Sequence, residues 1–148
     1  MDHVVYLDHR SKELKNLIYG KKSMIIRAAS GRKMPYGRVN NGDILYFIEN
    51  NGDGVVRAKA VASKVFNSDK LSTEESVALV EKHKDELQLH KRMHKRVSGK
   101  RYIVLIKLKN FQEIEPFPVD KSGFENMDDW LPVENINKVK VEKETEVK

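Results

Sequence analysis

The sequence of 148 residues has no cysteine, one tryptophan and no apolar run that approaches the length of a membrane span. Without cysteine the chain has no disulfide, no thiolate metal site and no cysteine nucleophile, which fits a reducing compartment. The N-terminal residues also lack the apolar segment of a secretory signal peptide. We therefore expect a cytoplasmic protein that does not enter membranes.

Acidic residues are missing from one long stretch and scarce in another. Residues 15–38 carry seven Lys or Arg and no Asp or Glu, and residues 82–101 carry eight against two acids. Residues 111–135 have the opposite balance, with seven acids and one Lys. If the two basic segments meet in space, they form a surface that attracts phosphates. The alternative is that each is a solvated basic face.

Several apolar or alternating stretches predict strands. A turn at residues 50–54 (NNGDG) joins two of them into a hairpin, and residues 113–118 are expected to be extended strand or loop. The predicted strands are residues 3–7, 23–28, 43–48, 55–66 and 102–108.

Two regions predict helices. The first is expected to end at Gly20, with Asp8 or Ser11 as its N-cap. The second begins with Ser72 and Glu75, whose spacing matches a capping box. Because strands and helices do not alternate regularly, the pattern favours an α+β fold, a small curved sheet or barrel with flanking helices.

A short motif stands where the first helix gives way to a strand. Gly20, Lys22 and Arg27 fall on three of the four fixed positions of G-x-K-x-x-E-x-R, and Ile25 stands in place of the glutamate. This stretch resembles the signature of the ASCH family. The Gly-Asp pair at residues 42–43 and the order of elements over residues 3–110 resemble that family too.

The resemblance implies a PUA-like mixed β-barrel with a cleft beside the motif, and an RNA-related role. We expect an RNA- or nucleotide-binding module that needs no cofactor, with a glycine-rich basic loop at residues 30–38 following the phosphates and Tyr36 stacking on a base. The expected binding residues are Lys21, Lys22, Arg27, Arg32, Lys33, Tyr36 and Arg38.

Three histidines in residues 83–94 raise the question of a metal. His90 and His94 share a helix face, but Lys91 stands where a zinc-binding HExxH motif has its glutamate. The lysines around them would repel a cation. We expect no metal site, and a solvated basic helix that is able to contact a phosphate backbone. The residues available for such contacts are His90, Lys91, Arg92, His94, Lys95 and Arg96.

Two other functions stay open. One branch of the ASCH family is an acetylcytidine amidohydrolase, and the resemblance would make Lys22 the reactive group of a hydrolase acting on a modified nucleoside or on RNA. Ile25 occupies the position of that branch's threonine nucleophile and has no hydroxyl, which argues against this chemistry. The other alternative is a protein-interaction domain that uses the acidic segment at residues 111–135.

The C-terminal region offers one aromatic anchor and a charged end. Trp130 follows two acidic residues in a predicted turn at residues 126–130, and we expect it to pack the C-terminal segment on the barrel. We expect residues 1–137 to form a single domain, and residues 138–148 to be a charged tail or an edge strand. The oligomeric state is left open.

Overall fold

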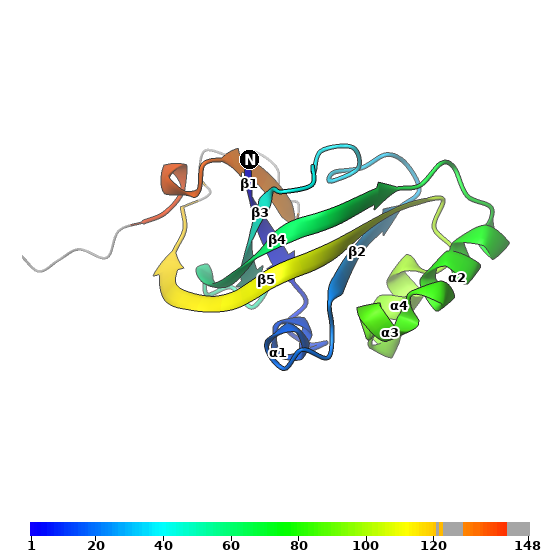
Figure 1. Ribbon diagram of the computed structural model, residues 1–148, viewed down its shortest axis with the longest axis horizontal. Coiled ribbons are helices and arrows are strands. Elements are labelled where there is room, and N and C mark those ends of the chain that lie inside the picture. Colours follow the sequence, from blue (N-terminus) through cyan, green and yellow to red (C-terminus); the bar gives the residue numbers. More distant parts are fainter. Residues whose placement is uncertain (121, 123–128, 142–148) are drawn as a thin grey trace, which may run out of the picture.

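The computed structural model describes residues 1–120, 122 and 129–141, and in them one mixed sheet of six strands curls into a half-barrel (Figure 1). The strand order is β2-β5-β4-β3-β1-β6; β1 and β3 are parallel and the other neighbours are antiparallel. This confirms the predicted α+β class. The strands are β1 (Asp2–Leu7), β2 (Met24–Ala29), β3 (Ile44–Glu49), β4 (Val55–Asn67), β5 (Tyr102–Pro118) and β6 (Trp130–Glu134).

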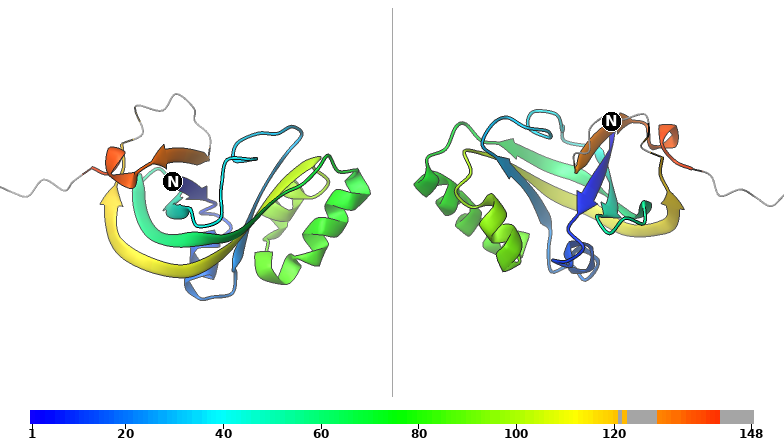
Figure 2. Two further views of the ribbon diagram at one scale, coloured as in Figure 1. Left: turned by 45° about the horizontal axis from the view of Figure 1, so that its top comes forward. Right: turned by 180° about the vertical axis from the view of Figure 1, so that it is seen from behind.

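The longest strands, β4 and β5, form a curved pair that wraps around β1 (Figure 2). The sequence predicted that the strand beginning at Tyr102 ends at Leu108, but β5 continues through residues 113–118. That extension is held by the ladder to β4, in which Val56 pairs with Phe117. Three register shifts along this ladder supply the bend, since bulges increase the local twist and curvature.

Strand β2 and the first part of β5, residues 102–106, are largely buried on both faces, which explains why these stretches are almost continuously apolar. Ile25 and Ile106 point into the half-barrel, where they join a core with Phe47. Ile26 and Leu105 point the other way, into a second core beneath the helices.

The helical layer lies at one end of the β4–β5 pair (Figure 1). The predicted capping box is confirmed: the Ser72 hydroxyl accepts from the Glu75 N–H at 3.1 Å, and Glu75 Oε1 accepts from the Ser72 N–H at 2.8 Å. The helices are α1 (Glu13–Ile18), α2 (Thr73–Lys82), α3 (Lys84–Leu87), α4 (Lys91–Val97) and a 3-10 turn, η1 (Ile136–Lys138). No helix in the described part of the chain is long and apolar enough to cross a membrane.

The start of α1 differs from the prediction. The N-cap is Lys12, which has a left-handed backbone (φ 56°) and no side-chain cap, so neither Asp8 nor Ser11 caps the helix. Ser11 instead donates its hydroxyl to the Asp8 carboxylate, and Glu13 accepts the Asp8 N–H at 2.8 Å. The carboxylate of the first turn therefore accepts a backbone N–H from the segment before the helix.

Trp130 anchors the C-terminal strand as predicted. It is buried at the start of β6, and its indole N–H donates to Nδ1 of His3 on the neighbouring β1 at 3.0 Å. Because Nδ1 accepts, the other ring nitrogen of His3 carries the proton and donates to Asp43 Oδ2 at 2.9 Å. Lys140 bridges to Val119, whereas residues 142–148 of the predicted tail and residues 126–128 of the predicted turn lie outside the described residues.

Candidate functional site

Lys22, the central residue of the motif, is buried rather than displayed. Its Nζ donates to the Leu87 carbonyl at 2.6 Å and lies 3.5 Å from Glu13 Oε2. Burial lowers the pKa of Lys22, and the negative charge of Glu13 opposes that shift. The amine thus links α1 to α3 inside the protein. Lys22 as a whole is only 3% exposed.

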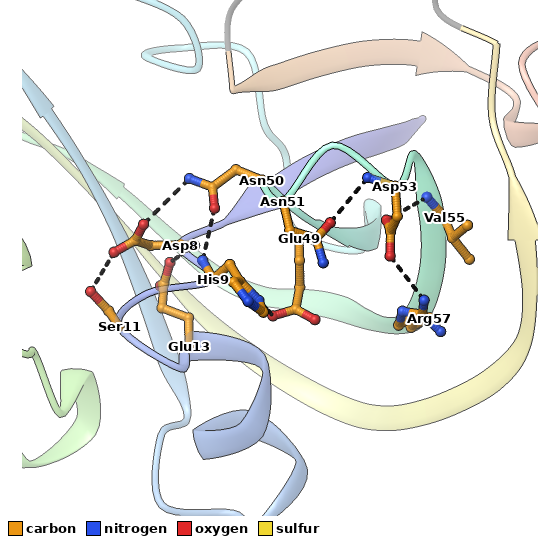
Figure 3. A network of polar contacts seen from close by, with 10 residues as sticks. All are labelled: Asp8, His9, Ser11, Glu13, Glu49, Asn50, Asn51, Asp53, Val55 and Arg57. Carbon is orange, nitrogen blue, oxygen red and sulfur yellow. Dashed lines mark hydrogen bonds and ion pairs between the residues drawn. The ribbon is translucent and has the colours of Figure 1, made fainter.

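The Glu13 partner of Lys22 belongs to a closed polar network at the end of β1 and β3 (Figure 3). Asp8 links Glu13 to Ser11 and accepts from Asn50 Nδ2 at 3.3 Å. Burial raises the pKa of Asp8, but the hydrogen bonds from Ser11 and Asn50 and the nearby arginines outweigh it and leave that pKa lowered. These groups satisfy one another, so the network is structural.

A pocket of about 490 Å³ opens on the other side of the motif, at the outer edge of β2. Its walls are β2, the loop after it and α4, and it is therefore the place where the two basic segments of the sequence meet. Five cationic side chains and one carboxylate line it: Arg27, Lys33, Lys95, Arg96, Lys100 and Asp129.

Arg27 is held rigidly in this pocket. Its Nη2 donates to the Tyr6 carbonyl at 2.6 Å, and its Nη1 donates to the Ile26 carbonyl at 2.9 Å. The guanidinium lies 5.5 Å from the centre of the Trp130 ring, in cation–π range. Its Nε is 3.2 Å from Asp129 Oδ2, an ion pair without the geometry of a hydrogen bond. Arg27 thus supplies a positive charge in a fixed position.

Aromatic rings form the wall of the pocket beside the loop. Tyr36 and Tyr102 meet edge to face with ring centres 5.6 Å apart, and the Tyr36 hydroxyl donates to the Ser68 carbonyl at 2.5 Å. The Arg32 guanidinium lies 5.7 Å from the Tyr36 ring centre and 5.6 Å from that of Tyr102. The three side chains make a positively charged surface of planar groups.

The outer edge of β2 adds backbone hydrogen-bonding groups. The Leu108 N–H donates to the Ser23 carbonyl at 3.0 Å, so in this antiparallel register every second residue from Ser23 bonds to β5. Ile26 and Ala28 therefore direct their N–H and C=O groups away from β5, toward the pocket that they line. The donation from Arg27 to the Ile26 carbonyl agrees with this direction.

The structure thus divides the residues that the sequence singled out. Arg27, Lys33 and Tyr36 line the pocket, and Arg32 stacks on its aromatic wall. Lys22 is buried elsewhere, while Lys21 and Arg38 are exposed outside the pocket lining.

The prediction of binding residues left out one wall of the pocket. Lys95 and Arg96 were recognised only as phosphate contacts of a basic helix, and Lys100 and Tyr102 were not singled out. The signal for them was the second basic segment, at residues 82–101. Its position opposite residues 30–36 depends on the tertiary packing of α4 against β2.

Comparison with solved structures identifies the class of fold. The chain superposes on the ASCH protein of Zymomonas mobilis with a TM-score of 0.65 at 16% sequence identity, covering 89% of this chain and 87% of that one. Two point-substituted variants of that protein give TM-scores of 0.66 and 0.62 at 16% and 17% identity, covering 89% and 86% of this chain and 89% and 82% of theirs. The sequence matches no family model and no curated protein in the comparisons made. The protein therefore has an ASCH-type fold.

Proposed function

We propose that this domain binds single-stranded RNA or a nucleotide in the pocket at the edge of β2. The observation that carries the proposal is the meeting of both basic segments in one cavity, where five cations oppose a single carboxylate. A volume of about 490 Å³ is also within the usual range of small-ligand pockets. Phosphate is the ligand group that such a charge balance favours.

The walls of the pocket suit different parts of a nucleotide. Lys95, Arg96 and Lys100 lie on the α4 side, and their N–H groups would donate to phosphate oxygens. The outward N–H and C=O of Ala28 match the donor and acceptor pairs on the edges of nucleobases. Tyr36 offers a ring for stacking, and such contacts contribute about 1–3 kcal/mol per base.

The proposal is tested by measuring the affinity for a fluorescent single-stranded RNA over a range of salt concentrations. The logarithm of the binding constant is expected to fall linearly with the logarithm of salt concentration, because bound phosphates release counterions. The double substitution Lys95→Glu/Arg96→Glu is expected to abolish most of the affinity.

A matched control separates the pocket from the overall charge. Lys21→Glu/Arg38→Glu makes the same change in net charge at two exposed positions outside the pocket lining. This pair is expected to weaken binding far less. An affinity that is independent of salt, or equal losses for both pairs, would contradict the proposed site.

A further inference from the structure

A second pocket, of about 360 Å³, lies on the helix-facing side of the sheet, where α2 and α3 meet β4 and β5. It shares no lining residue with the pocket at the β2 edge. Its floor and walls are apolar and its remaining side chains are charged or titratable. The lining residues are Met24, Lys64, Phe66, Leu79, Lys82, His83, Glu86, Leu105 and Lys107.

The strand residues that line this pocket form two rows across the paired strands β4, β5 and β2. Phe66 pairs with Leu105 in one row, while Lys64 pairs directly with Lys107 in the next, with Met24 beyond it on β2. Two lysines placed opposite each other across a ladder repel and reduce the stability of the sheet. Such a pair is explained if an anion binds between them.

Phe66 brings an exposed aromatic ring to the same place. It is 46% exposed, although Leu105 opposite it and Met24 in the neighbouring row are buried. The helices cover β2 and β5 on this side, and Leu79 of α2 reaches the pocket, but the ring of Phe66 on β4 stays open to solvent. An uncovered ring above an apolar floor is a suitable surface for a flat ligand.

The charges around Phe66 are mostly positive and only partly neutralised. Glu86 Oε2 lies 3.9 Å from the Lys107 amine, and Glu86 Oε1 is 3.0 Å from His83 Nδ1. Within the described ranges, no carboxylate lies within 4 Å of the amines of Lys64 or Lys82. The pocket therefore has three lysines and one carboxylate, which lies near Lys107 and also engages His83.

We propose that this second pocket binds a further stretch of the same single-stranded RNA, with one base stacked on Phe66 and a phosphate between Lys64 and Lys107. Lys82 of α2 adds the third cation. A base on an aromatic ring beside lysine-bound phosphates is the general arrangement of single-strand binders. The inference rests on the proposed function, since the ligand is the RNA that enters the first pocket.

The two pockets lead to different dependences on RNA length. An RNA of about 4 nucleotides is long enough for one pocket, whereas one of about 16 nucleotides has the length to reach both. Loss of the second pocket should therefore weaken the binding of the longer RNA and spare the shorter one. Loss of the first pocket should weaken both.

The experiment compares Phe66→Ala with Phe66→Trp by fluorescence anisotropy on oligouridylates of these two lengths. Phe66→Ala is expected to weaken binding of the longer RNA about tenfold, the loss of one stacked base, while Phe66→Trp retains it. Val77→Ala removes an equally exposed apolar side chain, 43% exposed, that does not line the pocket, and it should leave both affinities unchanged. Thermal unfolding of each variant verifies that the domain is folded.

Substitution of the lysine pair is expected to weaken RNA binding without lowering the stability of the domain. Lys64→Gln/Lys107→Gln is expected to reduce the salt dependence of binding to the longer RNA by about two counterions. The same change should leave stability unchanged or raise it, because it removes the repulsion across the ladder. A loss of stability with no change in the salt dependence would assign these lysines a structural role and overturn the inference.

The outcomes separate this inference from the proposed function. If Lys95→Glu/Arg96→Glu weakens both RNAs while Phe66→Ala weakens neither, or weakens both equally, the second pocket is refuted and the first stands. If the wild-type protein binds neither RNA, the proposed function itself fails. If Phe66→Ala abolishes binding of an acidic peptide and leaves RNA binding unchanged, the pocket binds a protein partner. That result would also refute the inference.

Discussion

Lys22 and Arg27 lie five residues apart in one motif, yet their side chains occupy opposite kinds of environment. Lys22 is enclosed between Glu13 and the Leu87 carbonyl, beneath α1 and α3. Arg27 is fixed by carbonyls and by the Trp130 ring at the wall of a pocket that four other cations share. Ile25, between them in the chain, points into the core of the half-barrel.

The difference shows that the partners of a basic residue, not its charge, decide whether it is engaged inside the fold or stays accessible to a ligand. The Lys22 amine has an internal carboxylate and a carbonyl, so a ligand would have to displace them. The Lys95 and Lys100 amines have no carboxylate within 4 Å in the part of the chain that the structure describes. Cations of the second kind are the ones available to a phosphate.

The largest effect should come from removing the enclosed lysine. Lys22→Ala leaves Glu13 buried without its cation, and breaking a buried pair in this way costs about 3–5 kcal/mol of unfolding free energy. Urea denaturation measures the loss, and Lys21→Ala, an exposed neighbour, should change stability by less than about 0.5 kcal/mol. A small effect of Lys22→Ala would show that the lysine is not the structural member of the pair.

Arg27→Ala should have an intermediate effect on stability and also weaken RNA binding. It leaves the Tyr6 carbonyl without its donor and uncovers the Trp130 face, which together should cost about 1–3 kcal/mol. Chemical denaturation and RNA titration on the same samples measure both effects. A loss of stability with full RNA affinity would place Arg27 with Lys22 as a purely structural cation.

Acid should destabilise the domain by protonating His3. The ring of His3 accepts the indole N–H of Trp130, whose ring lies next to the Arg27 guanidinium. Burial lowers the pKa of His3, and the hydrogen bond to Asp43 opposes the shift only in part. The unfolded chain therefore takes up the proton first, so stability is retained above about pH 6.5 and falls as the pH drops below it. A protonated ring would also turn an N–H toward the indole N–H of Trp130.

This dependence can be separated from that of the carboxylates. The lowered pKa of Asp8 makes its own contribution fall only at more acidic pH, below the ordinary range for aspartate, near 3.8. Denaturation midpoints between pH 8 and pH 5 should thus report His3, and His3→Phe should flatten the slope in that window. The limits of this window lie about 1.5 units above and below the ordinary histidine pKa. An unchanged slope in the variant would refute this assignment.

The smallest effect on stability is expected for the exposed pocket lysines that have no carboxylate within 4 Å among the described residues. Lys95→Ala and Lys100→Ala should each change the free energy of unfolding by less than about 0.5 kcal/mol, because both side chains are exposed. Each should nevertheless reduce the salt dependence of RNA binding by about one counterion. A stability loss comparable to that of Lys22→Ala would erase the distinction between the two environments.

The sequence was sufficient for the elements that local chemistry specifies. The capping box at Ser72, the glycine at position 20 with its φ of +72° and the apolar strands β2 and β5 follow from short-range patterns. The end of β5 did not follow from such patterns, because the two glutamates and two prolines in residues 113–118 fit an extended strand or a loop equally well. Pairing with the long strand β4 decides between the two.

The candidate site was predictable only in part, for a similar reason. The loop residues Arg32, Lys33 and Tyr36 lie next to the motif in sequence, so composition pointed to them. Lys22 is buried because it contacts Glu13 and the Leu87 carbonyl, which is 65 residues away. No pattern in the sequence around Lys22 indicates either contact. Long-range pairing thus decided which basic residues face the pocket.

The position of β1 has a consequence for the synthesis of the chain. This first strand lies between β3 and β6, so residues 2–7 gain their last neighbour only when residues 130–134 arrive. Until the ribosome has released them, the nascent sheet carries an open inner edge, and His3 waits without its indole donor. The sheet is therefore completed only after β6 has been made, and until then the edge of β1 that pairs with it stays accessible to a chaperone.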